Sequence, residues 1–185
     1  MACPRGGEDA GAKRSRERRA MRRVFTIAAV AGTLVSLAAP AASAADWRPF
    51  RTTPFVRTDT CPFPIRGDVV TDKEETRIDS TLPDGSPRVQ EFRGPLVMRF
   101  TNTSSGRSAV RDLSGYGRIH FFADGASAGY FPDNVGVRIP IGNPGYPAGY
   151  YVMHGGVRVT IAADGTREVH AIGHPTIENL CRTLG

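Results

Sequence analysis

Cysteine, tryptophan and lysine are scarce in this chain of 185 residues. It has 3 cysteines and 1 tryptophan, and Lys73 is the single lysine after residue 44, against 15 arginines. No Cys-x-x-Cys pair is present, which argues against a thiol redox site or a zinc ribbon. No apolar run after residue 44 is long enough to cross a bilayer, so the sequence predicts no later membrane-spanning helix.

An excess of charge of one sign is also lacking once the N-terminal segment is set aside. Residues 1–44 carry a net charge of +5 and residues 45–185 carry +1, although the whole chain has +6. The basic character therefore belongs to the N-terminal segment and gives no reason to expect a nucleic-acid partner. The 141 residues after position 44 fit one domain with a single core.

The N-terminal segment has the order of a signal peptide. An apolar stretch over 24–39 follows Met21-Arg22-Arg23 and precedes a run of small residues, which predicts cleavage before Ala45 or Asp46. We interpret 1–44 as a signal peptide with an N-terminal extension, with translation starting at Met21. The sequence leaves the general secretory and twin-arginine routes open. The mature protein is predicted to be extracellular, free or envelope-associated, without a membrane partner.

Two cysteines, Cys61 and Cys181, follow the predicted signal peptide. An even pair in an exported protein predicts a disulfide, here one that closes a loop of about 120 residues. Chain-entropy models assign such a loop roughly 4–5 kcal/mol. A domain of this size has a total stability of roughly 5–15 kcal/mol, so the predicted bond is a major stabilising feature.

Helix signals are nearly absent, and Gly and Pro separate short apolar runs at a spacing typical of antiparallel all-β domains. Over 135–141, Val and Ile at alternate positions share one face, and Pro140 indicates an edge strand. We predict an antiparallel β-sandwich over 61–185, with about nine or ten short strands between Gly67 and Ile172, and a small β-barrel as the alternative. Residues 45–60 show no periodicity and are predicted to form a flexible arm.

Tight turns are predicted where Gly follows a small polar residue, because such dipeptides adopt the positive φ angles of short hairpins. Residues 69–93 leave a short helix or a long hairpin open, and the hairpin is favoured because 82–86 has turn composition. Residues 176–184 are predicted to wind one helical turn that returns Cys181 to the first strand. The turn dipeptides are Asp84-Gly85, Ser105-Gly106, Asp124-Gly125 and Asp164-Gly165.

Several short pieces of the domain form a recognisable combination. They are Cys61-Pro62-Phe63-Pro64-Ile65, Phe100-Thr101-Asn102, Ser105-Gly106-Arg107-Ser108, Ser114-Gly115, the Asp124-Gly125 and Asp164-Gly165 turns, and the segment from Gly173 to Leu180-Cys181-Arg182-Thr183-Leu184. With them the chain resembles small secreted proteins common in actinobacteria, which carry a signal peptide, an all-β domain and a Cys near each end of it. The resemblance covers most of 61–184 and implies export and fold, but no activity.

Histidine and glutamate near the end of the chain supply the best metal candidate. Glu168, His170 and His174 would share a face of one continuous strand, and a catalytic zinc site needs three protein ligands. Gly173 and Pro175 interrupt that strand, however, and no established zinc spacing is present. An extracellular hydrolase or metal-dependent enzyme is therefore the alternative function. No cofactor and no catalytic residue is predicted, because the Gly-x-Ser-x-Gly nucleophile motif is lacking.

Aromatic residues in Gly/Pro-rich segments favour a binding role. Tyr130, Tyr146, Tyr150 and Tyr151 lie in or beside such segments, where rings suit stacking on sugars or packing on another protein. The competing interpretation places one of the adjacent tyrosines, Tyr150 or Tyr151, in the core. The sequence thus predicts an extracellular or envelope binding module whose partner is an envelope polysaccharide or another secreted protein. A structural envelope component is the third possibility.

Overall fold

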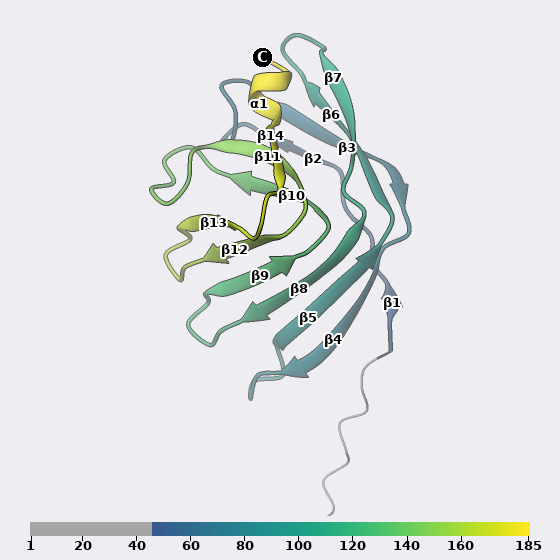
Figure 1. Ribbon diagram of the computed structural model, residues 1–185, viewed down its shortest axis with the longest axis vertical. Helices are drawn as coiled ribbons and strands as arrows, with labels where there is room; N and C mark the ends of the chain where they lie inside the picture. Colours follow the sequence, from purple (N-terminus) through teal and green to yellow (C-terminus); the bar gives the residue numbers. More distant parts are fainter. Residues whose placement is uncertain (1–45) are drawn as a thin grey trace, which may run out of the picture. The chain divides into compact units, whose positions relative to one another are not determined.

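The computed structural model describes residues 46–185, which form fourteen β-strands and one short helix (Figure 1). The predicted signal peptide, 1–44, lies outside these residues. No helix in the described part is long and apolar enough to span a membrane. The elements are β1 (Arg48–Pro49), β2 (Phe55–Arg57), β3 (Ile65–Asp72), β4 (Glu75–Thr81), β5 (Pro87–Gly94), β6 (Leu96–Asn102), β7 (Ser108–Asp112), β8 (Gly115–Phe121), β9 (Ser127–Phe131), β10 (Asn134–Ile139), β11 (Gly149–His154), β12 (Val157–Ile161), β13 (Arg167–Ala171), β14 (Thr176–Asn179) and α1 (Leu180–Thr183).

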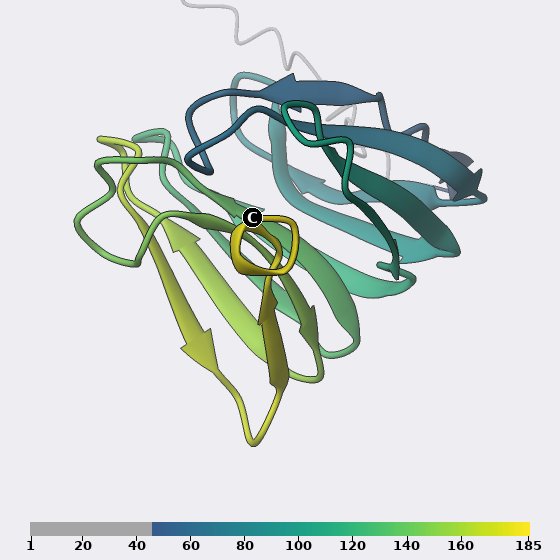
Figure 2. The same cartoon turned by 90° about the horizontal axis from the view of Figure 1, so that it is seen from above.

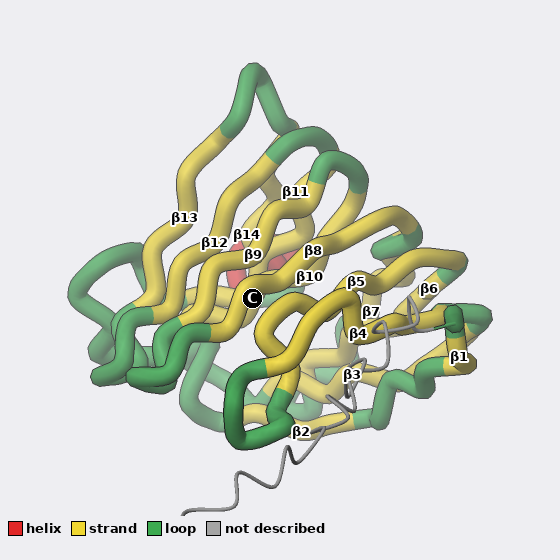
Figure 3. Tube along the Cα trace, turned by 90° about the horizontal axis from the view of Figure 1, so that it is seen from below, coloured by secondary structure: helices red, strands yellow, loops and turns green. Residues whose placement is uncertain are grey.

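The strands form three antiparallel sheets. Sheet A has the order β1-β4-β5-β8-β9-β12-β13, sheet B the order β2-β3-β6-β7, and sheet C the order β10-β11-β14. Figure 3 shows β13, β12, β9 and β8 of sheet A side by side. Sheet A ends in the edge strands β1 and β13. The predicted all-β fold with sandwich-like sheets is therefore confirmed, and the barrel alternative is wrong because the sheets do not close.

Each strand of sheet A continues, after a bend, into a strand of sheet B or sheet C. Linkers of one to five residues join β1 to β2, β3 to β4, β5 to β6, β7 to β8, β9 to β10, β11 to β12, and β13 to β14. Pro95 forms the bend between β5 and β6, and Gly155-Gly156 forms the bend between β11 and β12. Such residues weaken a straight ladder and so favour bends. Eleven strands, β3 to β13, occupy the region where about nine or ten were predicted.

Gly94 shows why one bend needs a glycine. Its φ is +119°, and a Cβ atom placed there would lie 2.5 Å from the carbonyl oxygen of Lys73. Any side chain would therefore both strain the backbone and collide with the neighbouring bent strand. The bend from sheet A to sheet B is thus fixed by the close approach of two backbones.

The core lies on both faces of β11. Tyr150 and Val152 pack against side chains of sheet B such as Phe100, in a cluster that we call the B–C core. Tyr151 and Met153 point the other way, into a cluster with β10, β12 and sheet A that we call the A–C core. β11 is therefore buried on both faces, which explains why it is apolar at successive positions rather than at alternate ones.

The predicted hairpins are confirmed. Residues 82–86 join β4 to β5, so the long hairpin is present and the helix alternative is wrong. In the turn at 162–166, the Ala162 amide donates to the Thr166 carbonyl at 2.8 Å, and Gly165 has a φ of +86°. The other three turn dipeptides likewise join paired strands. β10 is an edge strand as predicted, although Ile141 lies beyond its end and is exposed.

The predicted disulfide is present, and the helical turn predicted over 176–184 is present at Leu180–Thr183, whereas Thr176–Asn179 forms β14. Cys61 and Cys181 are bonded, with their Cα atoms 5.3 Å apart. Asn179 caps α1, since its side-chain oxygen accepts a hydrogen bond from the Cys181 amide at 2.9 Å. Leu180 and Leu184 are buried in the B–C core. Figure 2 shows α1 end-on beside the strands of sheet C, so the chain end closes one end of that core.

The segment 45–60, predicted as a flexible arm, contains two short paired strands within the residues that the structure describes. β1 pairs with β4 and β2 pairs with β3, so the segment forms the edge of two sheets. Phe55 stacks on Tyr150 with ring centres 5.6 Å apart, and Thr60 is buried. The sequence pattern missed these strands because each is only two or three residues long, too short to show alternation.

Candidate binding site

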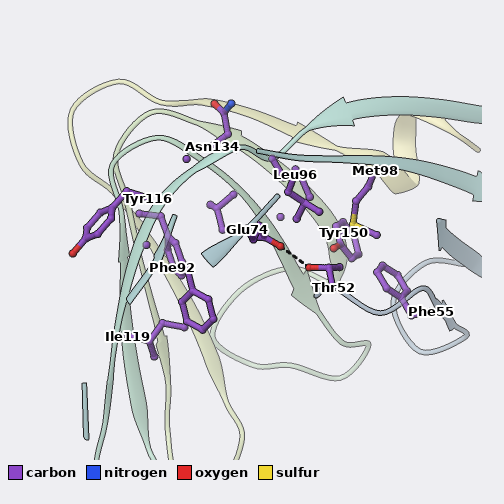
Figure 4. Close-up of a pocket in the computed structure, with 16 residues that line it drawn as sticks. Thr52, Phe55, Glu74, Phe92, Leu96, Met98, Tyr116, Ile119, Asn134 and Tyr150 are labelled. Carbon is purple, nitrogen blue, oxygen red and sulfur yellow. Dashed lines mark hydrogen bonds between the residues drawn. The ribbon is translucent and has the colours of Figure 1, made fainter. Parts of the chain in front are cut away.

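A cleft of 310 Å³ opens on the inner face of sheet A, where that sheet meets sheet C and bends into sheet B. Figure 4 shows the side chains that line it, which come from all three sheets and from the linker between β1 and β2. A second hollow of 160 Å³ shares several of its wall residues and reaches Arg138 and Arg167. Most of the cleft wall is apolar, including Phe55, Phe92, Ile119, Phe131, Val135 and Tyr150.

Glycines within the strands shape this cleft. A Cβ atom at Gly117 or Gly129 would lie 2.7 or 2.5 Å from the ring of Phe131, so the ring lies directly over these two glycines. Gly67 makes similar room for the ring of Phe55, which a Cβ atom would approach to 2.6 Å. Sequence reasoning missed this arrangement, and its signal was the presence of glycine inside strands, which often marks a close approach.

One end of the cleft is polar. The Thr52 hydroxyl donates to Glu74 Oε2 at 2.7 Å (Figure 4). Burial raises the pKa of Glu74 and the nearby charge of Asp72 adds to this effect, which together outweigh the opposing hydrogen bond from Thr52. Among residues 46–185, Glu74 has no ion-pair partner. The cleft therefore combines apolar walls with one uncompensated carboxylate.

The outer face of sheet A is polar and centres on a buried acid. Glu91 is 3% exposed, accepts a hydrogen bond from the Tyr116 hydroxyl at 2.7 Å, and pairs with Arg77. Arg118 Nη1 lies 3.7 Å from the same carboxylate. Burial alone would raise the pKa of Glu91, but these hydrogen bonds and positive charges hold it below its ordinary value. The carboxylate is thus ionised and compensated from three sides, as a buried charge requires.

Trp47 covers the edge of this polar network. The guanidinium carbons of Arg77 and Arg93 lie 4.9 and 4.0 Å from the centre of its ring, within the range of cation–π contacts. Arg93 also pairs with Glu75 at 2.9 Å. The lone tryptophan of the chain therefore helps to fix the first edge strand on the outer face rather than to line the cleft.

The four tyrosines predicted as a ligand surface do not lie together. Tyr150 and Tyr151 are 7% and 6% exposed and point into opposite cores, so both belong to the protein interior. The Tyr151 hydroxyl donates to the Pro147 carbonyl at 3.1 Å. Tyr146 is half-buried against Tyr151, and Tyr130 alone is exposed, on the outer face of sheet A. Because β11 is buried on both faces, its adjacent residues Tyr150 and Tyr151 both lie inside. The sequence pattern therefore predicted a larger ligand surface than these tyrosines provide.

Tyr130 stands between two arginines on the outer face. Strand register places it directly opposite Arg118 of β8 and Arg158 of β12. A shallow hollow of 300 Å³ here is also lined by His120 and Phe122, and the Phe122 side chain is exposed. Arg158 has no ion-pair partner among the residues that the structure describes.

The candidate metal ligands are only partly brought together. Glu168 Oε2 and His170 Nε2 lie 3.3 Å apart on the exposed side of β13. His174 lies beyond the end of that strand, in the bend before β14, because the chain turns at Gly173. No group of three or more metal-ligating side chains occurs within residues 46–185.

Comparisons with protein-family models, with curated proteins and with solved structures found no match. The resemblance to small secreted actinobacterial proteins therefore stays a prediction from the sequence. Function has to be inferred from the cleft and from the outer face themselves.

Proposed function

We propose that the protein is an exported binding module that takes a small, mainly apolar molecule in the cleft between sheets A and C. The observation that carries this proposal is a cleft of 310 Å³ whose walls include the half-buried side chains of Phe92, Ile119 and Phe131. Ligand sites typically have volumes of roughly 300–1,000 Å³ and apolar walls with a few polar groups. Half-buried aromatic rings gain more burial when such a ligand enters.

A binding role suits the cleft better than hydrolysis. The described residues that line it include no serine, cysteine or histidine, so the usual pairing of a nucleophile with a histidine base is lacking there. Its one carboxylate, Glu74, has no second acid among the lining residues for paired acid–base chemistry. The enzyme alternative thus finds less support in this site than binding does.

The proposal of export is supported by the signal-like segment at 1–44 and by the disulfide, because disulfides persist in oxidising compartments. The first test is to fractionate a producing culture and to determine the N-terminus of the processed protein. A chain that starts at Ala45 or Asp46, in the medium or on the envelope, is the expected result. Full-length protein inside the cell would contradict export.

Binding in the cleft is tested with 1-naphthylmethanol, a neutral and mainly apolar probe whose fluorescence reports its surroundings. We expect saturable binding to the wild-type protein and at least about a tenfold loss in Val135→Phe, which fills the cleft. Val110→Phe is the matched control, because Val110 is exposed on β7, away from the cleft. Equal binding by Val135→Phe and the wild type, with unchanged melting temperature, would exclude the cleft as the site.

The outer face supports a second candidate, an acidic polysaccharide of the envelope. Sugar rings would stack on Tyr130 while acid groups pair with Arg158, which lies opposite it in register. We expect retention on immobilised polygalacturonate but not on neutral dextran, and loss of retention in Tyr130→Ala and Arg158→Ala. Arg99→Ala, an exposed position on β6, serves as the matched control. Equal retention of all variants would contradict this candidate.

A further inference from the structure

We propose that Glu74 makes the cleft selective for apolar molecules that carry a protonated amine. This inference rests on the proposed function, since it concerns the ligand of the same cleft. It follows from the contacts of a single carboxylate, from the charges around it and from the rings that line the same cleft.

The Glu74 carboxylate is available to a ligand. The Thr52 hydroxyl holds Oε2 at 2.7 Å, and Oε1 accepts no hydrogen bond from residues 46–185. Glu74 is half-buried and lines the apolar cleft, so its charge is only partly solvated. A carboxylate in such surroundings gains more from a cation than it would in water, because a low dielectric strengthens the pairing.

The charges nearest to Glu74 add to this preference. Asp72, two residues before it, accepts hydrogen bonds from the amides of Thr52 and Glu74 at 2.8 and 3.0 Å. The nearby cation, Arg51, is directed to Asp72, with Nη1 3.8 Å from Oδ1. Arg51 is thus directed to Asp72 rather than to Glu74, and a ligand cation at Glu74 would supply a positive charge that no ion pair among residues 46–185 gives it.

Aromatic side chains complete the site for an ammonium group. Phe55, Phe92 and Tyr150 line the same cleft as Glu74 (Figure 4). The faces of such rings attract cations, and their surfaces also pack against an apolar ligand body. One site thus accommodates both parts of an amine with an apolar skeleton, whereas an apolar carboxylate would meet Glu74 with a like charge.

Three probes with one ring system test this preference: protonated 1-naphthylmethylamine, 1-naphthylmethanol and 1-naphthoate. At pH 7 we expect the wild-type protein to bind the amine about tenfold more tightly than the alcohol, and the naphthoate most weakly. In Glu74→Gln the amine should lose this advantage while the alcohol binds as before. Glu75→Gln is the matched control, because Glu75 is the next residue but pairs with Arg93 on the outer face.

The outcomes separate this inference from the proposed function. If the alcohol binds but the amine shows no advantage, the amine preference is wrong. If the advantage persists in Glu74→Gln, its assignment to Glu74 is wrong. In both cases the cleft still binds ligands. If none of the probes binds, the proposed function itself fails. Glu74→Asp, which keeps the charge, should retain part of the preference and provides a second test should Glu74→Gln fold poorly.

The pH dependence of amine binding gives an independent readout. Glu74 faces Thr52 and Asp72, and Arg51 is the cation directed to that acid. The ionised form of Glu74 binds the amine, and burial raises its pKa above the ordinary value of 4.5. The advantage of the amine over the alcohol should therefore begin to disappear above pH 4.5 as the pH falls. If the amine keeps its advantage well below pH 4.5, the role of Glu74 is overturned.

Discussion

The two halves of sheet A have the same antiparallel pairing but different cover on their inner faces. Under sheet C, Val157 of β12 is completely buried and Val159 nearly so. On β4, by contrast, Ile78 is 38% exposed, and Phe92 and Ile119 on the neighbouring strands are only half-buried. The half formed by β9, β12 and β13 therefore belongs to the core, while the half formed by β4, β5 and β8 provides one wall of the cleft.

This difference follows from where the chain bends. β9, β12 and β13 continue into, or arise from, the strands of sheet C, which fold back over their own half of sheet A. By contrast, β3 precedes β4 and β6 follows β5, and both of these strands belong to sheet B. Sheet B packs on sheet C in the B–C core. Apolar area left half-covered contributes less to stability than it would when buried, and such area often marks a binding site.

The largest effect that tests this comparison is the truncation of two isoleucines: Ile139 of sheet C, which covers the buried half, and Ile78 in the less covered half. Ile139 is completely buried in the A–C core, so Ile139→Ala should lower the free energy of unfolding by about 2–5 kcal/mol. Ile78→Ala removes the same atoms from a half-exposed position and should cost less than about 1 kcal/mol. Urea unfolding followed by circular dichroism measures both values. Equal losses would show that the two halves are covered alike.

The disulfide is expected to have the next largest effect, and to act on both halves together. Its loss in the double variant Cys61→Ser/Cys181→Ser should cost about 2–4 kcal/mol, because the unfolded chain regains the freedom of the closed loop. The unfolding midpoint of the wild type should fall to that of the variant when reductant is added. A midpoint that does not change on reduction would contradict a stabilising role for this bond.

Much of the fold was predictable because its signals are local. The hairpin at 162–166, the edge position of the strand before Pro140 and the return of Cys181 each depend on a few neighbouring residues or on one pair. Periodicity also identified the strand that contains Val137 and Ile139. Turn chemistry and alternation do not depend on the rest of the molecule, which is why these predictions are confirmed.

The candidate site was not predictable in the same way. Tyr150 and Phe55 meet only because two sheets pack, and Glu74 enters the cleft only because the chain bends beside Gly94. In the sequence, Glu91 has the pattern of a solvent-exposed acid on a strand. In the structure, Arg77 of β4 and Tyr116 and Arg118 of β8 surround it. Contacts between residues far apart in the chain leave no periodic trace, so sequence reasoning assigned binding to the loop tyrosines instead.

The smallest expected effect concerns how the less covered half is held from its outer face. Glu91 joins β4, β5 and β8 through Arg77, Tyr116 and Arg118, so Glu91→Gln should cost about 1–3 kcal/mol at pH 7. Because these partners hold the pKa of Glu91 below 4.5, its contribution is complete above that pH and is lost as the pH falls further. The stability of the wild type should therefore approach that of the variant under acid. If instead the wild type and Glu91→Gln differ in stability by the same amount at every pH down to the acid transition, this network does not hold the sheet. Packing on the inner face alone would then support both halves.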